Sequence, residues 1–206
     1  MPGSLTAADD GALLMKVNVI ENDRLLIRPV VDDDKESFMR IQIENSDLAA
    51  AYKDEQLRDY FWETTLNGDA DIYMMIFMKE DGTHVGNCSF QKLNSESSEI
   101  GMDIDKRFQN QGIGTATLIL LAEYLRKNAP GKRHTIRTKS NNIPCQRMIA
   151  KAGGVKVDEG KTSFDSTMEG LIHSLEAHGL PEEAEKSKTV LDSAKGICAF
   201  IYEFPS

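Results

Sequence analysis

A loop of polar residues and glycines stands directly before the most apolar helix that this sequence predicts. It spells Gln109-Asn110-Gln111-Gly112-Ile113-Gly114, and the helix that follows ends before Pro130. A helix start needs only one capping side chain, so a whole polar loop requires another reason. The first backbone N–H groups of a helix have no acceptor within it, and glycine lets a ligand come close to them. With the partial positive charge of the helix end, the N–H groups of Gln111 to Thr115 predict a cradle for a phosphorylated ligand.

Two well-known phosphate-binding loops do not fit this spelling. A P-loop NTPase requires G-x-x-x-x-G-K-[ST], but Gly114 is followed by Thr115 and Ala116 without a lysine. A dinucleotide-binding loop requires G-x-G-x-x-G, and Thr117 stands where the third glycine would be. A core helix that is merely capped by glycine remains the alternative to a ligand site.

The hydrophobic pattern around the loop predicts an α/β domain of the α+β kind. Three consecutive strands are followed by alternating helices and strands, an order that favours a mixed sheet with helices on its faces. Asp81-Gly82 marks a hairpin between the first two of the three strands. We expect strands at 24–31, on both sides of this hairpin within 71–93, and at 98–105, 133–139, 155–161 and 196–204, and helices at 32–45, 54–67, 113–129, 141–154 and within 163–195.

Charge is distributed unevenly along the chain, whose formal net charge is -9. Residues 106–151 hold ten basic residues and one acid, a net charge of +9, so the remainder carries -18. The overall charge excludes general nucleic-acid binding. The basic segment flanks the glycine loop and predicts a local anionic ligand, whereas the acidic remainder favours a cationic partner. A solvated basic helix face is the alternative explanation of the segment.

The remaining composition is that of a globular chain with a single domain. We expect a flexible leader over 1–22 and one domain over 23–206, without a secretory signal. No apolar run approaches the ~20 residues that span a bilayer, so we expect no membrane association. Cys88, Cys145 and Cys198 are odd in number and widely spaced. They predict neither a disulfide framework nor a metal site, and they suit the cytoplasm.

Three stretches together resemble one enzyme superfamily. Gln109 to Gly114 match [QR]-x-x-G-x-[GA], the strand EIGMDID resembles E-I-G-[YW]-x-[IL], and NNIPCQRMIAKAGG resembles N-x-x-S-x-R-x-x-x-K-x-G-F. The chain is thereby similar to the GNAT superfamily of acetyl-CoA-dependent N-acetyltransferases, most of all to the subgroup of ribosomal-protein amino-terminal acetyltransferases. Cys145 stands where serine is usual, and Gly154 replaces the phenylalanine.

The resemblance implies a GNAT-type mixed, largely antiparallel sheet and acetyl-CoA as co-substrate. It implies direct attack of a primary amine on the thioester within a ternary complex, so that proximity supplies much of the rate. The acceptor is a small-molecule amine or a peptide amino terminus. The pyrophosphate lies on the loop, and the pantetheine arm pairs with the strand before it. The implied cofactor-binding residues are Met102, Ile104, Gln109, Asn110, Gln111, Gly112, Ile113, Gly114, Thr115 and Asn142.

The catalytic groups are less constrained by the pattern. A carboxylate has to accept the proton of the amine, and Glu99 and Asp103 share one face of a strand; we prefer Glu99. The resemblance gives Cys145 the role of protonating the departing thiolate. A solvated carboxylate and a small packing residue are the alternatives for Glu99 and Cys145. Another class of function is a degenerate GNAT domain that binds acyl-CoA as a regulatory or interaction module.

Residues 163–195 have no counterpart in the family pattern. They form two amphipathic helical stretches that break at Gly179-Leu180-Pro181, before the last strand. We expect a helical insertion that covers the acceptor entrance. A contact in a homodimer and a plain surface excursion are the alternatives.

Overall fold

The computed structural model describes residues 17, 19–46, 49, 52, 54–68, 70–161, 163–177, 179, 181–193 and 198–205. Most of the expected leader, residues 1–16 and 18, lies outside this part. Ile20–Glu21 form the short strand β1, which pairs antiparallel with β2. These two residues of the expected leader therefore belong to the sheet.

An eight-stranded sheet organises the domain, in the order β1-β2-β3-β4-β5-β6-β8-β7. All its neighbouring strands are antiparallel except β5 and β6. The expectation of a mixed, largely antiparallel sheet flanked by helices is confirmed. Besides β1, the strands are β2 (Leu25–Pro29), β3 (Ile72–Met78), β4 (His84–Gln91), β5 (Ser97–Ile104), β6 (Arg133–Lys139), β7 (Val155–Gly160) and β8 (Ala199–Glu203).

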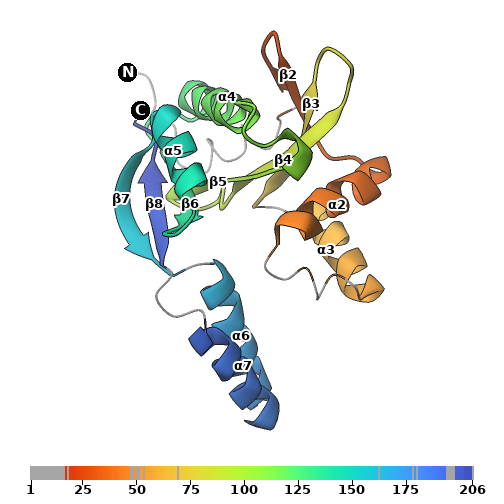
Figure 1. The fold of residues 1–206 in the computed structure, drawn as a ribbon, viewed down its shortest axis with the longest axis vertical. Coiled ribbons are helices and arrows are strands. Elements are labelled where there is room, and N and C mark those ends of the chain that lie inside the picture. Colours follow the sequence, from red (N-terminus) through yellow and green to blue (C-terminus); the bar gives the residue numbers. More distant parts are fainter. Residues whose placement is uncertain are drawn as a thin grey trace, which may run out of the picture.

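Helices cover both faces of this sheet. Side chains alternate between the faces along a strand, and in β3 Met74 and Ile76 enter one core while Met75 enters another. Helix α4 (Ile113–Asn128) packs on the first face, with α5 (Ile143–Lys151) beside it, and α2 (Lys35–Asn45) and α3 (Glu55–Asn67) cover the second. Figure 1 shows these two groups of helices on either side of β4 and β5.

The parallel pair β5 and β6 opens partway along its length. The two strands are paired only from Ser97 opposite Arg133 to Ile100 opposite Ile136. Beyond this point β5 stays paired with β4 as far as Ile104, and β6 stays paired with β8 as far as Lys139. The end of the β4–β5 pair is therefore separated from the end of the β6–β8 pair by a gap in the sheet. We call the line between β5 and β6, with this gap at its open end, the seam.

The expected helical insertion forms a hairpin of α6 (Ser163–Ala177) and α7 (Pro181–Ser193) before β8. Met168 and Ile172 of α6 and Ala184 of α7 are buried. Figure 1 shows the hairpin extending away from the sheet, beyond the ends of β7 and β8, with the two helices packed on each other. The apolar faces of the insertion are thus satisfied mainly within the hairpin.

Candidate active site

The loop before α4 is held in its conformation by hydrogen bonds from its own side chains to nearby backbone carbonyls. Asn110 and Gly112 have φ angles of 60° and 78°, so the backbone turns twice through the left-handed region. Gln109 donates from Nε2 to the carbonyl of Ile104, and Gln111 donates from Nε2 to the carbonyl of Arg107. Both amide side chains are therefore used to close the loop.

A buried carboxylate anchors the start of the same loop. The side chain of Asp105 is inaccessible to solvent and lies 2.6 Å from a guanidinium nitrogen of Arg107 and 2.8 Å from one of Arg40. It also accepts a hydrogen bond from the backbone N–H of Arg107, which caps the 3-10 helix Lys106–Phe108. The Arg107 hydrogen bond, helped by Arg40, holds the pKa of Asp105 far below its usual range. The loop is thus tied to α2 through Arg40.

The backbone N–H groups of the loop provide the test of whether a phosphate fits. Ala116 makes the first bond of α4, to the carbonyl of Gly112. Within the described part of the chain, the N–H groups from Gln111 to Thr115 donate to no acceptor. A Cβ on Gly112 would have only a guanidinium nitrogen of Arg24, 3.9 Å away, near it. Unpaired donors in open space beside a cation match the requirements of a pyrophosphate.

A cleft of about 550 Å³ runs from this loop along α5. It is lined by the end of β5, the loop and the polar face of α5, including Arg147 and Lys151. Eight of the ten residues expected to bind the cofactor line it: Met102, Ile104, Gln109, Asn110, Gly112, Gly114, Thr115 and Asn142.

Gln111 and Ile113 do not line this cleft. Gln111 is exposed, and its carbonyl accepts a hydrogen bond from Arg24. The side chain of Ile113 is buried in the core, so only its backbone N–H remains to face a ligand. Asn45, Arg147 and Lys151 line the cleft but were not predicted to bind the cofactor. The motif contains Arg147 and Lys151, whereas Asn45 comes from α2 and belongs to no local pattern.

A second cleft, of about 610 Å³, lies between the seam and helices α2 and α3. Its walls carry the aromatic side chains Phe38, Phe61 and Tyr73, polar side chains of β4, and Arg137 and Lys139 of β6. Four residues line both clefts, and all of them lie at the seam. They are Met102, Asp103, Cys145 and Met148.

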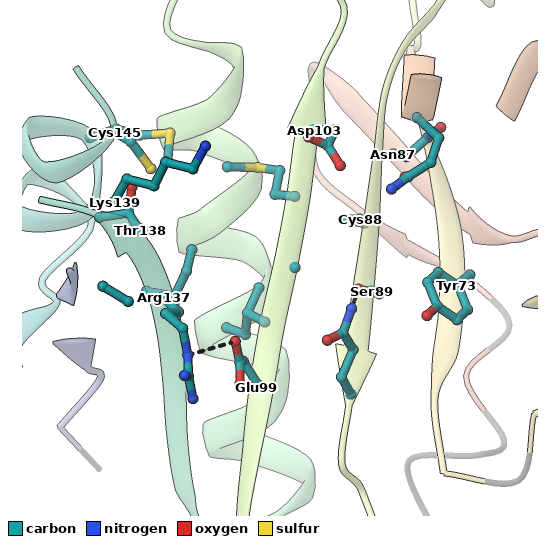
Figure 2. Close-up of a pocket in the computed structure, with 18 of the residues that line it drawn as sticks. Tyr73, Asn87, Cys88, Ser89, Glu99, Asp103, Arg137, Thr138, Lys139 and Cys145 are labelled. Atoms are coloured by element: carbon teal, nitrogen blue, oxygen red, sulfur yellow. Dashed lines mark hydrogen bonds and ion pairs between the residues drawn. The ribbon is translucent and has the colours of Figure 1, made fainter. Parts of the chain in front are cut away.

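The two carboxylates of β5 have different surroundings, as Figure 2 shows. Glu99 lies near the paired end of the seam, 2.6 Å from Nζ of Lys92 and 3.5 Å from Nε of Arg137. Asp103 lies at the open end, beside both clefts, and no hydrogen bond or ion pair holds its side chain within the described residues. Burial raises the pKa of Asp103 to about 6.

Cys145 lies across the seam from Asp103, on the first turn of α5. Asn142 caps this helix by accepting a hydrogen bond from the backbone N–H of Cys145 at 3.2 Å. Burial raises the pKa of the Cys145 thiol; a hydrogen bond with Thr138 opposes this rise and the charge of Asp103 adds to it. The thiol is therefore protonated at neutral pH.

Comparison with known proteins decides what this arrangement is. The model of the acetyltransferase (GNAT) domain matches residues 24–155, which is more than half of the chain. The chain belongs to the GNAT family. As a GNAT acetyltransferase it is an acyltransferase that uses acetyl-CoA as its co-substrate.

Solved structures share the GNAT fold at low sequence identity. The ribosomal L7/L12 alpha-N-protein acetyltransferase RimL, in complex with coenzyme A, is 15% identical, with a TM-score of 0.63 and coverage of 90% of this chain and 97% of that chain. The GNAT acetyltransferase from Bacillus anthracis is 18% identical, with a TM-score of 0.62 and the same coverages of 90% and 97%. A chimera of the spermidine N-acetyltransferase SpeG from Vibrio cholerae and hSSAT is 14% identical, with a TM-score of 0.56 and coverages of 68% of this chain and 85% of that chain. At these identities the likeness shows the fold alone.

Two further searches, one of curated proteins and one for membrane-spanning helices among the described residues, found no match. No curated protein sequence matches this GNAT chain. Among the residues that the structure describes, none of the helices has the length and apolar character needed to cross a membrane.

Proposed function

We propose that this chain is an N-acetyltransferase that moves the acetyl group from acetyl-CoA directly to a primary amine, within a ternary complex. The observation that carries the proposal is the seam, where one cleft built around unpaired loop N–H groups meets a second cleft of similar size. Because Met102, Asp103, Cys145 and Met148 line both clefts, two substrates bound there would meet at these residues. Placing two reactants side by side is the main requirement of a direct transfer.

Each group of the site has a separate task in the proposed reaction. Acetyl-CoA supplies a thioester, whose carbonyl a backbone N–H of β5 at Met102 to Ile104 would polarise. A carboxylate of β5, either Glu99 or Asp103, takes the proton of the amine. In this proposal the protonated thiol of Cys145 neutralises the departing sulfur.

The acceptor we propose is a cationic amine, either a small molecule or a peptide amino terminus. RimL is named as a protein alpha-N-acetyltransferase and the SpeG chimera as a spermidine N-acetyltransferase, so proteins of this fold differ in their acceptors. The acidic character of the chain outside residues 106–151 supports a cation. The three free thiols support a reducing, cytoplasmic location.

Gly112→Glu tests the cofactor site. The side chain would enter the phosphate cradle and repel the pyrophosphate, so coenzyme A binding should fall at least about 100-fold in calorimetric titration. Gly131→Glu is the matched control, because Gly131 has a similar φ angle of 87° with no heavy atom within 4 Å of its Cβ position and lies outside the cleft. It should bind normally.

Acetyl transfer itself is tested by following the release of free thiol with spermidine, lysine and a serine-headed tetrapeptide. The proposal expects acceptor-dependent release with at least one of these amines. Coenzyme A affinity equal in the Gly112→Glu and wild-type proteins would reject the cofactor site. Tight binding without transfer to any amine would instead support a degenerate, non-catalytic GNAT domain.

A further inference from the structure

We infer that Asp103 is the group that takes the proton from the attacking amine, an inference that rests on the proposed function. The choice lies between the two carboxylates of β5, because they are the acidic side chains that line the second cleft in the described part of the chain. Asp103 also lines the first cleft, whereas Glu99 does not. A base has to reach the nitrogen at the point where that nitrogen meets the thioester. Only Asp103 stands at this point.

Two ion pairs hold Glu99 at the paired end of the seam, outside the first cleft. Its two carboxylate oxygens face Lys92 at 2.6 Å and Arg137 at 3.5 Å. Glu99 therefore acts in the structure as a fixed anion that orients Arg137 along the wall of the second cleft.

The groups that face Asp103 leave it available. Cys145 of α5 lies across the seam, and Arg137 and Lys139 of β6 line the same cleft. Tyr73 on β3, Cys88 on β4 and Glu99 on its own strand are the remaining titratable residues that line that cleft. No ion pair joins any of them to Asp103 in the described residues. Burial alone raises its pKa to about 6, which leaves Asp103 ionised at neutral pH and more basic than an exposed aspartate.

The proton and electron balance of the step is closed by groups at the seam. The ammonium of the acceptor gives one proton to the Asp103 carboxylate, and the freed lone pair forms the C–N bond while the C–S bond breaks. The sulfur leaves as a thiolate. The second proton, shed by the nitrogen as it becomes an amide, neutralises this thiolate directly or by way of Cys145. Asp103 then returns its proton to water through the second cleft, so each turnover releases one proton.

The test compares three variants with the wild-type protein over about pH 5 to 9. Asp103→Asn keeps the size of the side chain and removes its basicity, Asp103→Glu keeps a carboxylate, and Glu99→Gln is the matched control on the same strand. kcat and KM are measured with the best amine among spermidine, lysine and the serine-headed tetrapeptide. Coenzyme A affinity and melting temperature are measured on the same samples, to separate loss of the base from loss of the fold or the cofactor site.

Wild-type kcat/KM should fall below about pH 6, well under the range in which the amine itself titrates. This fall is the acidic limb of the pH profile. Asp103→Asn should lose about 100-fold or more in kcat and should no longer show the acidic limb, while it binds coenzyme A normally. Asp103→Glu should restore the limb, and Glu99→Gln should retain it.

An acidic limb that survives in Asp103→Asn, or one that disappears in Glu99→Gln, would overturn the inference and leave the transferase function standing. A wild-type protein that acetylates none of the three amines would overturn both.

Discussion

Asp103 and Asp105 stand two positions apart at the end of β5, and their surroundings shift their pKa values in opposite directions. Two arginines hold Asp105 ionised, whereas Asp103 is partly buried, has no ion-pair partner among the described residues and keeps its proton to about pH 6. Asp105 thus stabilises the loop that it begins, while Asp103 carries a charge that its surroundings disfavour. A charge that costs stability at a cleft indicates a functional residue.

Asp103→Asn should therefore make the fold more stable at neutral pH. The pKa of Asp103 rises from 3.8 in the unfolded chain to about 6 in the folded one. Its contribution to the free energy of unfolding is therefore most favourable below pH 3.8 and declines as the pH rises to about 6. The shift sets an upper bound of about 3 kcal/mol on the free energy of unfolding that the replacement adds at about pH 7.5. The gain itself should be smaller, because solvent screens a partly exposed group. Chemical denaturation at about pH 7.5 and pH 4 checks this, because the gain should vanish at the lower pH.

Asp105→Asn is the control with the opposite sign. Its lowered pKa contributes stability above the unfolded value, which is lost as the pH falls toward the folded one. The variant should lose stability at about pH 7.5, where Arg40 and Arg107 would be left without their buried anion. Equal losses in both aspartate variants would contradict the assignment of Asp103 as an unpartnered charge.

At the scale of elements, the α6–α7 hairpin should be separable from the transferase. No described residue of α6 or α7 lines either cleft, so the acceptor-lid interpretation lacks the contact that it requires. Replacing residues 163–195 by a short glycine-serine linker should leave coenzyme A affinity and kcat/KM within about threefold, since long surface insertions cost little to remove. Calorimetry, acceptor kinetics and the mass in solution check this. A broader range of acceptors would support the acceptor-lid interpretation. A mass that falls from that of a dimer to that of a monomer would show that the hairpin is a dimer contact.

The sequence predicted those elements whose pattern is local. The glycine loop, the hairpin at Asp81-Gly82 and the break before Pro181 each depend on the conformation of a few consecutive residues, and the structure has all three. β1 was missed, because two residues carry no periodicity and form a strand only against β2. The surroundings of Glu99 and Asp103 could not be predicted from the sequence pattern either. Arg137 and Cys145 reach β5 only through the pairing of β6 and the position of α5, which sequence spacing does not encode.

At the scale of the whole molecule, charge separation should make catalysis sensitive to salt. The chain carries -18 outside its basic segment, so a cationic acceptor is attracted over distances that salt screens within about 10 Å. With spermidine, kcat/KM should fall about threefold to tenfold between about 0.02 M and 0.2 M NaCl, mainly through KM. A neutral hydroxylamine ether is the matched acceptor, and its rate should stay nearly constant. A spermidine rate that is independent of salt would remove the steering argument.

The short pairing of β5 with β6 also has a consequence for inhibitor chemistry. The strands separate after Ile100 and Ile136, and the two clefts share Met102 and Asp103 as lining residues beyond this point. A conjugate that joins coenzyme A to the acceptor amine through the acetyl carbon is designed to occupy both clefts at once. Linking the two ligands spares the second its entropy of association, so such a conjugate should bind far more tightly than either part. Conjugates built on different amines would then rank the acceptors by affinity alone, without any turnover.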